Sequence, residues 1–180
     1  LPTTSVMQAD QGLIILGGPN RHHHWSNLDV AEQVHTILRA QPHIKWQVAT
    51  SPRTPTQIEA SLELPAAVPL RPWQKFDADW LKQQMVQAGQ IWVSSDSASM
   101  LSEAVATFAR VGVIDLPVKS AENKLVRFVD SLLARGLLQT YSMACENGCD
   151  LPFPAAGFAP LAEHRRCAAL VLKALGLAEL

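Results

Sequence analysis

Cysteine and net charge are both scarce in this 180-residue chain. Its three cysteines, Cys145, Cys149 and Cys167, are odd in number and clustered late, which argues against a disulfide framework and favours a reducing compartment. Fifteen basic and sixteen acidic residues leave a formal net charge of -1. This balance excludes the broad basic surface that electrostatic nucleic-acid binding requires, so we expect no nucleic-acid partner.

Long apolar runs are also missing. No stretch approaches the ~20 apolar residues that a membrane-spanning helix needs, so the sequence predicts no transmembrane segment and leaves only peripheral membrane association open. Residues 1–10 show no basic region followed by an apolar run, which argues against a signal peptide. We therefore expect a cytoplasmic protein. Because the chain lacks an initiator Met, we expect a fragment or a processed product.

Composition and periodicity indicate one α/β domain. With 48% hydrophobic and 17% charged residues, residues 1–180 suit a single globular domain, with 1–11 as a linker and 161–180 as a terminal helical segment. Short apolar runs alternate with amphipathic stretches, which predicts right-handed βαβ units. The expected fold is a three-layer α/β/α, Rossmann-like domain with a mostly parallel sheet.

The expected strands cover 12–16, 44–50, a less regular stretch at 66–70, 90–94 and 111–116. Helices are expected from Asn27, up to Leu62, over 77–88, along a stripe from Leu101 to Phe108, over 121–135 and over 161–175. The polar stretch 141–160 is expected to be irregular. Ligands of parallel sheets sit at the carboxyl ends of the strands, which directs attention to three loops.

The first loop contains Gly17, Gly18 and Asn20, where glycines let backbone N–H groups approach an anion. A tight turn explains the same residues equally well, and neither the dinucleotide fingerprint nor the P-loop pattern is present. The second loop places Arg53, between Ser51 and Thr54, at the start of a helix. A guanidinium there favours a phosphate, although a capped turn with a solvated Arg accounts for it as well.

The third loop has the helix-capping residues Ser95, Asp96 and Ser97, followed on a polar helix face by Ser99, Ser102 and Glu103. Free N–H groups at this helix start could hold a diphosphate, and Glu103 could accept hydrogen bonds from two ribose hydroxyls. The alternative is a capped amphipathic helix with a solvated Glu.

The sequence offers little support for a metal site or a bound cofactor. Consecutive His22, His23 and His24 do not share one face, and no further ligands stand at metal-binding spacing. We therefore expect no metal and no cofactor, with His24 or Trp25 packing or hydrogen bonding at the mouth of the site. No G-x-S-x-G signature appears either, and the sequence names no catalytic residue.

Taken together, the ordered motifs resemble the carboxyl-terminal half of the elongated-mitochondria family, the mitochondrial-fission proteins of plants with many bacterial relatives. The motifs are Gly17-Gly18-Pro19-Asn20 with His24-Trp25, Thr50-Ser51 with Arg53-Thr54-Pro55, Trp92-Val93-Ser94 with Asp96-Ser97 and Ser99-Met100, Glu103-Ala104, and Leu161-Ala162-Glu163 with Arg166-Cys167-Ala168.

That family is in turn similar to glycosyltransferases with two facing Rossmann-like domains (GT-B type), whose carboxyl-terminal domain binds the nucleotide-sugar donor. The resemblance implies a nucleotide-sugar or nucleoside-diphosphate partner and a preceding amino-terminal α/β domain that carries the acceptor surface. It also implies that Gly17, Gly18, Ser97 and Ser99 line the diphosphate, that Arg53 assists it and that Glu103 binds the ribose.

Two other functions remain open. A non-enzymatic interaction protein could keep the fold and the pocket, because fold similarity does not establish chemistry. A nicotinamide-dependent oxidoreductase fits the fold but lacks the G-x-G-x-x-G turn and its acidic partner, so it ranks last.

Overall fold

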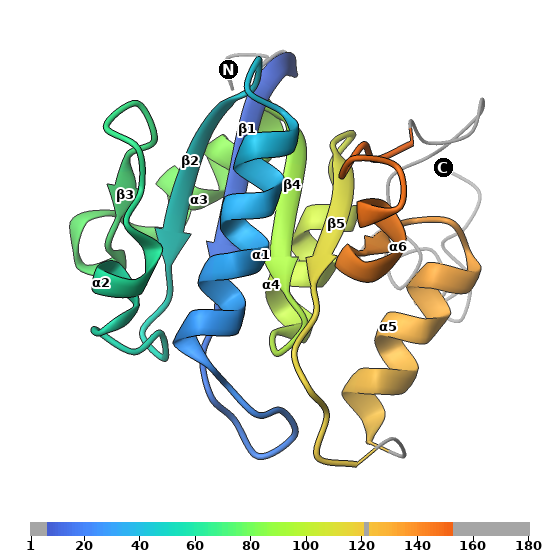
Figure 1. Ribbon diagram of the computed structural model, residues 1–180. Helices are drawn as coiled ribbons and strands as arrows, with labels where there is room; N and C mark the ends of the chain where they lie inside the picture. Colours follow the sequence, from blue (N-terminus) through green and yellow to red (C-terminus); the bar gives the residue numbers. More distant parts are fainter. Residues whose placement is uncertain (1–6, 121–122, 153–180) are drawn as a thin grey trace, which may run out of the picture.

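The computed structural model describes residues 7–120 and 123–152, and a six-stranded sheet forms the centre of this part (Figure 1). Neighbouring strands are all parallel and lie in the order β3-β2-β1-β4-β5-β6. This is the strand order of a doubly wound Rossmann-type sheet, with its switch point between β1 and β4. The expected fold class is therefore confirmed. The strands are β1 (Gln8–Leu16), β2 (Lys45–Thr50), β3 (Leu70–Arg71), β4 (Ala88–Ser94), β5 (Arg110–Ile114) and β6 (Gln139–Thr140).

Helices cover both faces of the sheet. One face packs against α1, α2 and α6, and the other against α3, α4 and α5. Figure 1 shows α1 in front of the strands and α3 behind them. The helices are α1 (Asn27–Ala40), α2 (Ile58–Leu62), a single 3-10 turn η1 (Trp73–Lys75), α3 (Ala78–Gln87), α4 (Ala98–Val105), α5 (Lys124–Ala134) and α6 (Tyr141–Cys145).

The central strand β1 shows why the sheet needs cover on both sides. Leu13 and Ile15 belong to the core beneath α3, α4 and α5, whereas Ile14 and Leu16 belong to the core beneath α1. All four side chains are fully buried, and each such burial contributes roughly 1.5–3 kcal/mol. A strand buried on both faces reads as an unbroken apolar run, as the run before Gly17 does.

Two tryptophans lie over glycines of the neighbouring strand. Trp46 stands in register with Gly12 and Trp92 with Gly112. A Cβ added at Gly12 would lie 2.2 Å from the ring of Trp46, and one at Gly112 would lie 2.4 Å from the ring of Trp92. The two glycines therefore make room for indole rings on the sheet.

Several boundaries differ from the sequence expectation. β1 begins at Gln8, so residues 8–11 of the expected linker are strand. Their side chains are largely exposed and all but Ala9 are polar, which conceals this extension in the sequence. β5 ends at Ile114 rather than at residue 116, and 66–69 form turns before the two-residue strand β3. Phe108, expected on a buried helix stripe, follows the end of α4 and is 63% exposed.

The segment expected to be irregular after residue 141 begins with the short helix α6, and β6 precedes it. Elements of two and five residues are too short to show a period in the sequence. The expected helix 161–175 lies outside the described residues. In the part that is described, no helix has the length and apolar character needed to cross a membrane.

Candidate ligand-binding site at the carboxyl edge of the sheet

The three loops singled out in the sequence meet at the carboxyl edge, beside the switch point. Gly18 comes from the β1–α1 loop, Arg53 from the β2–α2 loop and Asp96 from the β4–α4 loop. Asp96 Oδ2 accepts a hydrogen bond from Gly18 N at 3.0 Å and lies 2.8 Å from Arg53 Nη2. The predicted convergence of the loops is thus observed.

The Asp96 carboxylate is the centre of this cluster. Its side chain is completely buried, and its second oxygen, Oδ1, accepts a hydrogen bond from Ser94 Oγ at 2.6 Å. Hydrogen bonds to an ionised carboxylate are about twice as strong as neutral ones. One buried charge therefore holds three loops, and through Ser94 the end of β4, in a fixed arrangement.

Asp96 changes which groups can reach a ligand. Gly17 N donates to Ser94 Oγ at 2.7 Å, and Gly18 N donates to Asp96. Both N–H groups that were expected to face a diphosphate are satisfied within the chain. Arg53 is also engaged by Asp96, but 42% of its side chain remains exposed, so its outer edge can still meet an anion.

Steric contacts explain why glycine stands at both positions 17 and 18. A Cβ on Gly17 would lie 2.2 Å from Asp96 Oδ2, and one on Gly18 would lie 2.0 Å from the carbonyl oxygen of Arg53. Real Cβ atoms do not approach that closely. Gly17-Gly18 thus allows the loops to close on one another.

Asn20 extends the same network toward the histidines. Its Nδ2 donates to the Asp96 carbonyl oxygen at 3.0 Å. Its Oδ1 accepts from His22 N at 2.7 Å and from His23 N at 2.8 Å. Asn20 therefore shapes the β1–α1 loop from within.

Thr54 fastens the β2–α2 loop to the end of β1. Its Oγ1 shares its one hydroxyl proton between the carbonyl oxygens of Leu16 at 2.8 Å and Gly17 at 2.5 Å, and it accepts from Ser51 N at 2.8 Å. Ser51 Oγ in turn accepts from Arg53 N at 3.3 Å. These residues position Arg53.

The start of α4 differs from the other longer helices. The N-cap side chains of α1, α3 and α5 accept hydrogen bonds from helix N–H groups, whereas Ser97, the N-cap of α4, makes no such bond. Its Oγ lies 3.4 Å from Ser99 Oγ instead. Ala98 and Ser99 are exposed and Met100 is half-buried. The first turn of α4, where the positive end of the helix dipole lies, is therefore open to solvent at Ala98 and Ser99.

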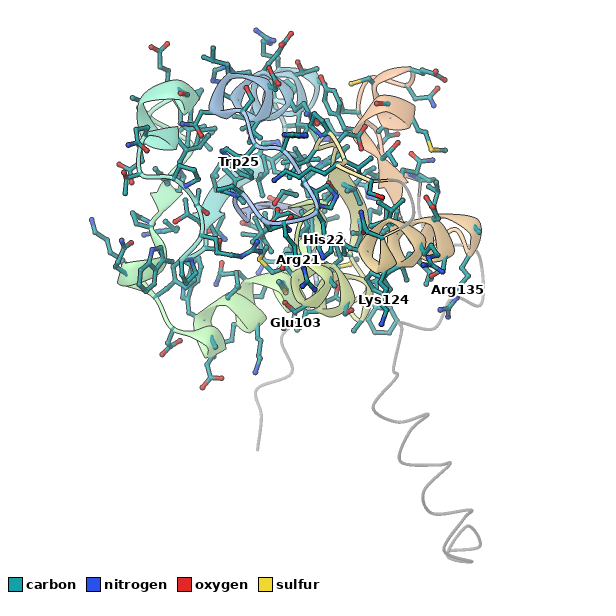
Figure 2. The ribbon with its side chains drawn as sticks, turned by 90° about the horizontal axis from the view of Figure 1, so that it is seen from below. Arg21, His22, Trp25, Glu103, Lys124 and Arg135 are labelled. Carbon is teal, nitrogen blue, oxygen red and sulfur yellow. The ribbon has the colours of Figure 1, made fainter. Side chains whose placement is uncertain are left out.

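Glu103 lies one turn further along α4 and is exposed. Figure 2, seen from below Figure 1 and so toward the carboxyl edge, shows Glu103 on the outer side of α4 and Arg21 from the β1–α1 loop near it in projection. Arg21 is exposed, and its Nε donates to His22 Nε2 at 2.9 Å. Sequence reasoning missed this second guanidinium, although its place directly after Asn20 was a usable signal.

A short antiparallel contact closes the edge on the β5 side. His23 forms a bridge with Val118, His24 N donates to the Pro117 carbonyl oxygen at 2.8 Å, and Lys119 N donates to the His22 carbonyl oxygen at 2.8 Å. His23, not His24, is the buried histidine, with 2% of its surface exposed. Burial lowers the pKa of His23 below its ordinary value of 6.5, and the charge of Asp96 opposes that shift.

An open hollow of about 560 Å³ lies under the start of α1. His24 and Trp25, which the sequence expectation places at the mouth of the site, line this hollow together with Pro55 and Lys119. Trp25 Nε1 donates to Asn27 Oδ1 at 2.6 Å, which holds the indole half-buried. Within 7–120 and 123–152, no three His, Cys, Asp or Glu residues gather as metal ligands would.

Strand order and edge loops define a Rossmann-type α/β domain with a polar, partly cationic switch-point edge. More specifically, the chain belongs to the mitochondrial fission ELM1 family, whose model matches residues 2–175. The expected family is confirmed. A comparison with curated proteins found no match.

Proposed function

We propose that this domain binds a nucleoside-diphosphate sugar with its diphosphate at the start of α4. The observation that carries the proposal is the exposed helix start beside the switch point of the sheet, where the side chain of the N-cap Ser97 accepts no hydrogen bond from a helix N–H group. Helix N-termini bind phosphates through such N–H groups and through the helix dipole, and the switch point is where doubly wound folds bind nucleotides.

In this proposal the surrounding residues have separate roles. Ser97, Ser99 and Met100 present backbone N–H groups to the diphosphate, and the exposed edge of Arg53 adds a cationic donor. Glu103 accepts the ribose hydroxyls. Asp96 does not touch the ligand, because its carboxylate is buried against Arg53 and Gly18.

The chemistry that follows is glycosyl transfer, in which charge develops on the departing diphosphate. The α4 dipole and Arg53 would stabilise that charge by electrostatic preorganisation. By its resemblance to two-domain glycosyltransferases, we propose that the acceptor surface belongs to an amino-terminal α/β domain outside this chain. The domain alone then binds the donor without turning it over.

Calorimetric titration tests this proposal. Uridine, guanosine and adenosine diphosphates are compared with the corresponding nucleosides. We expect at least one diphosphate to bind and its nucleoside to bind far more weakly. Glu103→Ala should weaken binding by about tenfold or more, since hydrogen bonds to a charged group contribute ~1.5–3 kcal/mol. Glu32→Ala on exposed α1 is the matched control. Absence of binding by every diphosphate at millimolar concentration would refute the donor site.

A second function is favoured by a different observation. Asp96 occupies the Gly18 N–H and pairs with Arg53, as expected where a former anion site has been closed by the chain itself. Under this alternative the protein is a non-enzymatic interaction protein that keeps the fold. The same titration separates the two, because this alternative predicts no nucleotide binding.

A further inference from the structure

A second, smaller hollow lies beside the candidate site, between the end of β5 and α5. Its volume is about 210 Å³. Apolar side chains of β5 and α5, among them Val113 and Val129, form much of its wall. Its polar lining consists of His23, Ser95, Asp115 and Asp130.

His23 is the unusual member of this lining. The residue is 2% exposed, and its Nδ1 has no hydrogen-bond partner among the described residues. A buried polar atom without a partner costs free energy that a ligand group would recover. Burial lowers the pKa of His23, so the ring is neutral at neutral pH and can exchange a hydrogen bond with an uncharged hydroxyl.

Two of the other polar groups, Ser95 and Asp115, are held in place by the fold. Ser95 Oγ accepts from Leu116 N at 3.3 Å, which leaves its hydroxyl proton to donate. The backbone of Asp115 exchanges two hydrogen bonds with Gln33, and its Oδ2 accepts from Ser142 Oγ at 2.6 Å. The hollow is therefore lined by positioned groups that both donate and accept.

Charge and size select the ligand class. Two carboxylates and one neutral imidazole line the hollow, and none of the described residues that line it is Lys or Arg. Such a lining repels a phosphate and suits hydroxyl groups, which donate well to carboxylates. A volume of about 210 Å³ lies below the ~300–1,000 Å³ of sites for drug-sized ligands, so it accommodates one ring rather than a nucleoside.

We propose that this hollow binds the sugar ring of the donor, an uncharged, hydroxyl-rich ring of hexose size. The inference rests on the proposed function, because Ser95 stands two residues before Ser97 and so joins the hollow to the start of α4. The nucleoside diphosphate and the sugar then occupy adjoining parts of one edge, the first cationic and the second acidic.

The first test compares each nucleoside diphosphate with its hexose derivative by calorimetry. We expect the hexose derivative to bind about tenfold tighter to the unaltered protein, as one or two added hydrogen bonds would give. Val126 of α5 also lines the hollow, so Val126→Phe fills it, and His23→Phe removes its imidazole. Both should abolish the sugar-dependent gain and leave diphosphate affinity unchanged, whereas Val86→Phe on the exposed surface of α3 should preserve the gain.

The second test needs no nucleotide. Free glucose and N-acetylglucosamine, added at high millimolar concentration, should shift the methyl resonances of Val126 and Val129 and not those of Val86. Diphosphate binding without a sugar-dependent gain and without methyl shifts would overturn the sugar site alone. Failure of every diphosphate to bind would overturn the proposed function, and the methyl shifts would still decide whether the hollow takes a sugar.

Discussion

The cluster around Asp96 and the start of α4 both present hydrogen-bond donors and positive charge at the same edge of the sheet. They differ in whether a carboxylate of the chain itself binds those donors. At the first, a buried carboxylate accepts from Gly18 N and pairs with Arg53. At the second, the side chain of the N-cap Ser97 accepts no hydrogen bond from a helix N–H group. One place is closed by the chain and the other is open to solvent.

This difference separates positioning from binding. Asp96, Asn20 and Thr54 connect loops through hydrogen bonds that no ligand needs to supply. A rigid cluster then holds the open helix start in a fixed place, which lowers the ordering cost of binding. Mutations in the Asp96 cluster should therefore lower the stability of the fold. Mutations at the start of α4 should instead change the affinity for the ligand.

The largest effect is expected from Asp96→Ala. Removing one partner of a buried ion pair costs ~3–5 kcal/mol, and we expect about 3 kcal/mol because solvent reaches Arg53 and weakens the pair. Urea unfolding measures the change, with Glu32→Ala on exposed α1 as the control. Equal stability of Asp96→Ala and the unaltered protein would show that the cluster does not hold the loops.

A smaller effect is expected from Gly18→Ala. The added Cβ would lie 2.0 Å from the Arg53 carbonyl oxygen, and overpacking of this kind costs ~1–3 kcal/mol. Gly148→Ala supplies a contrast, because no heavy atom lies within 4 Å of its added Cβ and only its φ of +64° opposes the change. The melting temperature should fall further for Gly18→Ala. The reverse order would argue against close contact between the loops.

Cap mutants compare the open helix start with a closed one directly. Asn123 Oδ1 accepts from Leu125 N and Val126 N at the start of α5, so Asn123→Ala should cost about 1 kcal/mol. Ser97→Ala should cost only a few tenths of that amount, because its hydroxyl caps no N–H group. Denaturant unfolding measures the loss of unfolding free energy in the two variants. Equal losses would mean that the Ser97 side chain does cap α4.

The smallest effect concerns pH. Because burial lowers the pKa of His23 from 6.5, the unfolded chain binds the proton more readily than the folded one. The contribution of the neutral His23 to the stability of the folded state is complete above pH 6.5 and is lost as pH falls toward the lowered folded pKa. Urea unfolding across this range should give a flatter profile for His23→Gln than for the exposed-site control His43→Gln. If unfolding free energy changed with pH equally in both variants, the pH dependence would come from a group other than His23.

The sequence predicts the architecture well because burial on two faces leaves long apolar signals. The run ending at Leu16 and the stripe of α5, closed by Gly136 in a left-handed conformation, are examples. The convergence of the three loops also follows, since parallel strands bring their carboxyl ends to one edge. The short elements β6 and α6 gave no period and were missed.

The roles within the site are harder to predict. Ser-Asp-Ser has the same appearance whether it caps an exposed helix or buries a carboxylate, so the sequence alone could not assign Asp96 to the interior. His23 was hidden in a run of three histidines. Only its bridge to Val118, a contact between segments distant in sequence, makes it the buried one.

Ser99→Asp is the most direct test of the account. A carboxylate in the first turn of α4 complements the helix dipole and should raise stability by ~0.3–1 kcal/mol, while its charge should weaken nucleoside-diphosphate binding by at least tenfold. Ser102→Asp, one turn further along, should leave affinity nearly unchanged. Opposite changes in stability and affinity for Ser99→Asp would support an anion site at the helix start. Unchanged diphosphate affinity in that variant would contradict it.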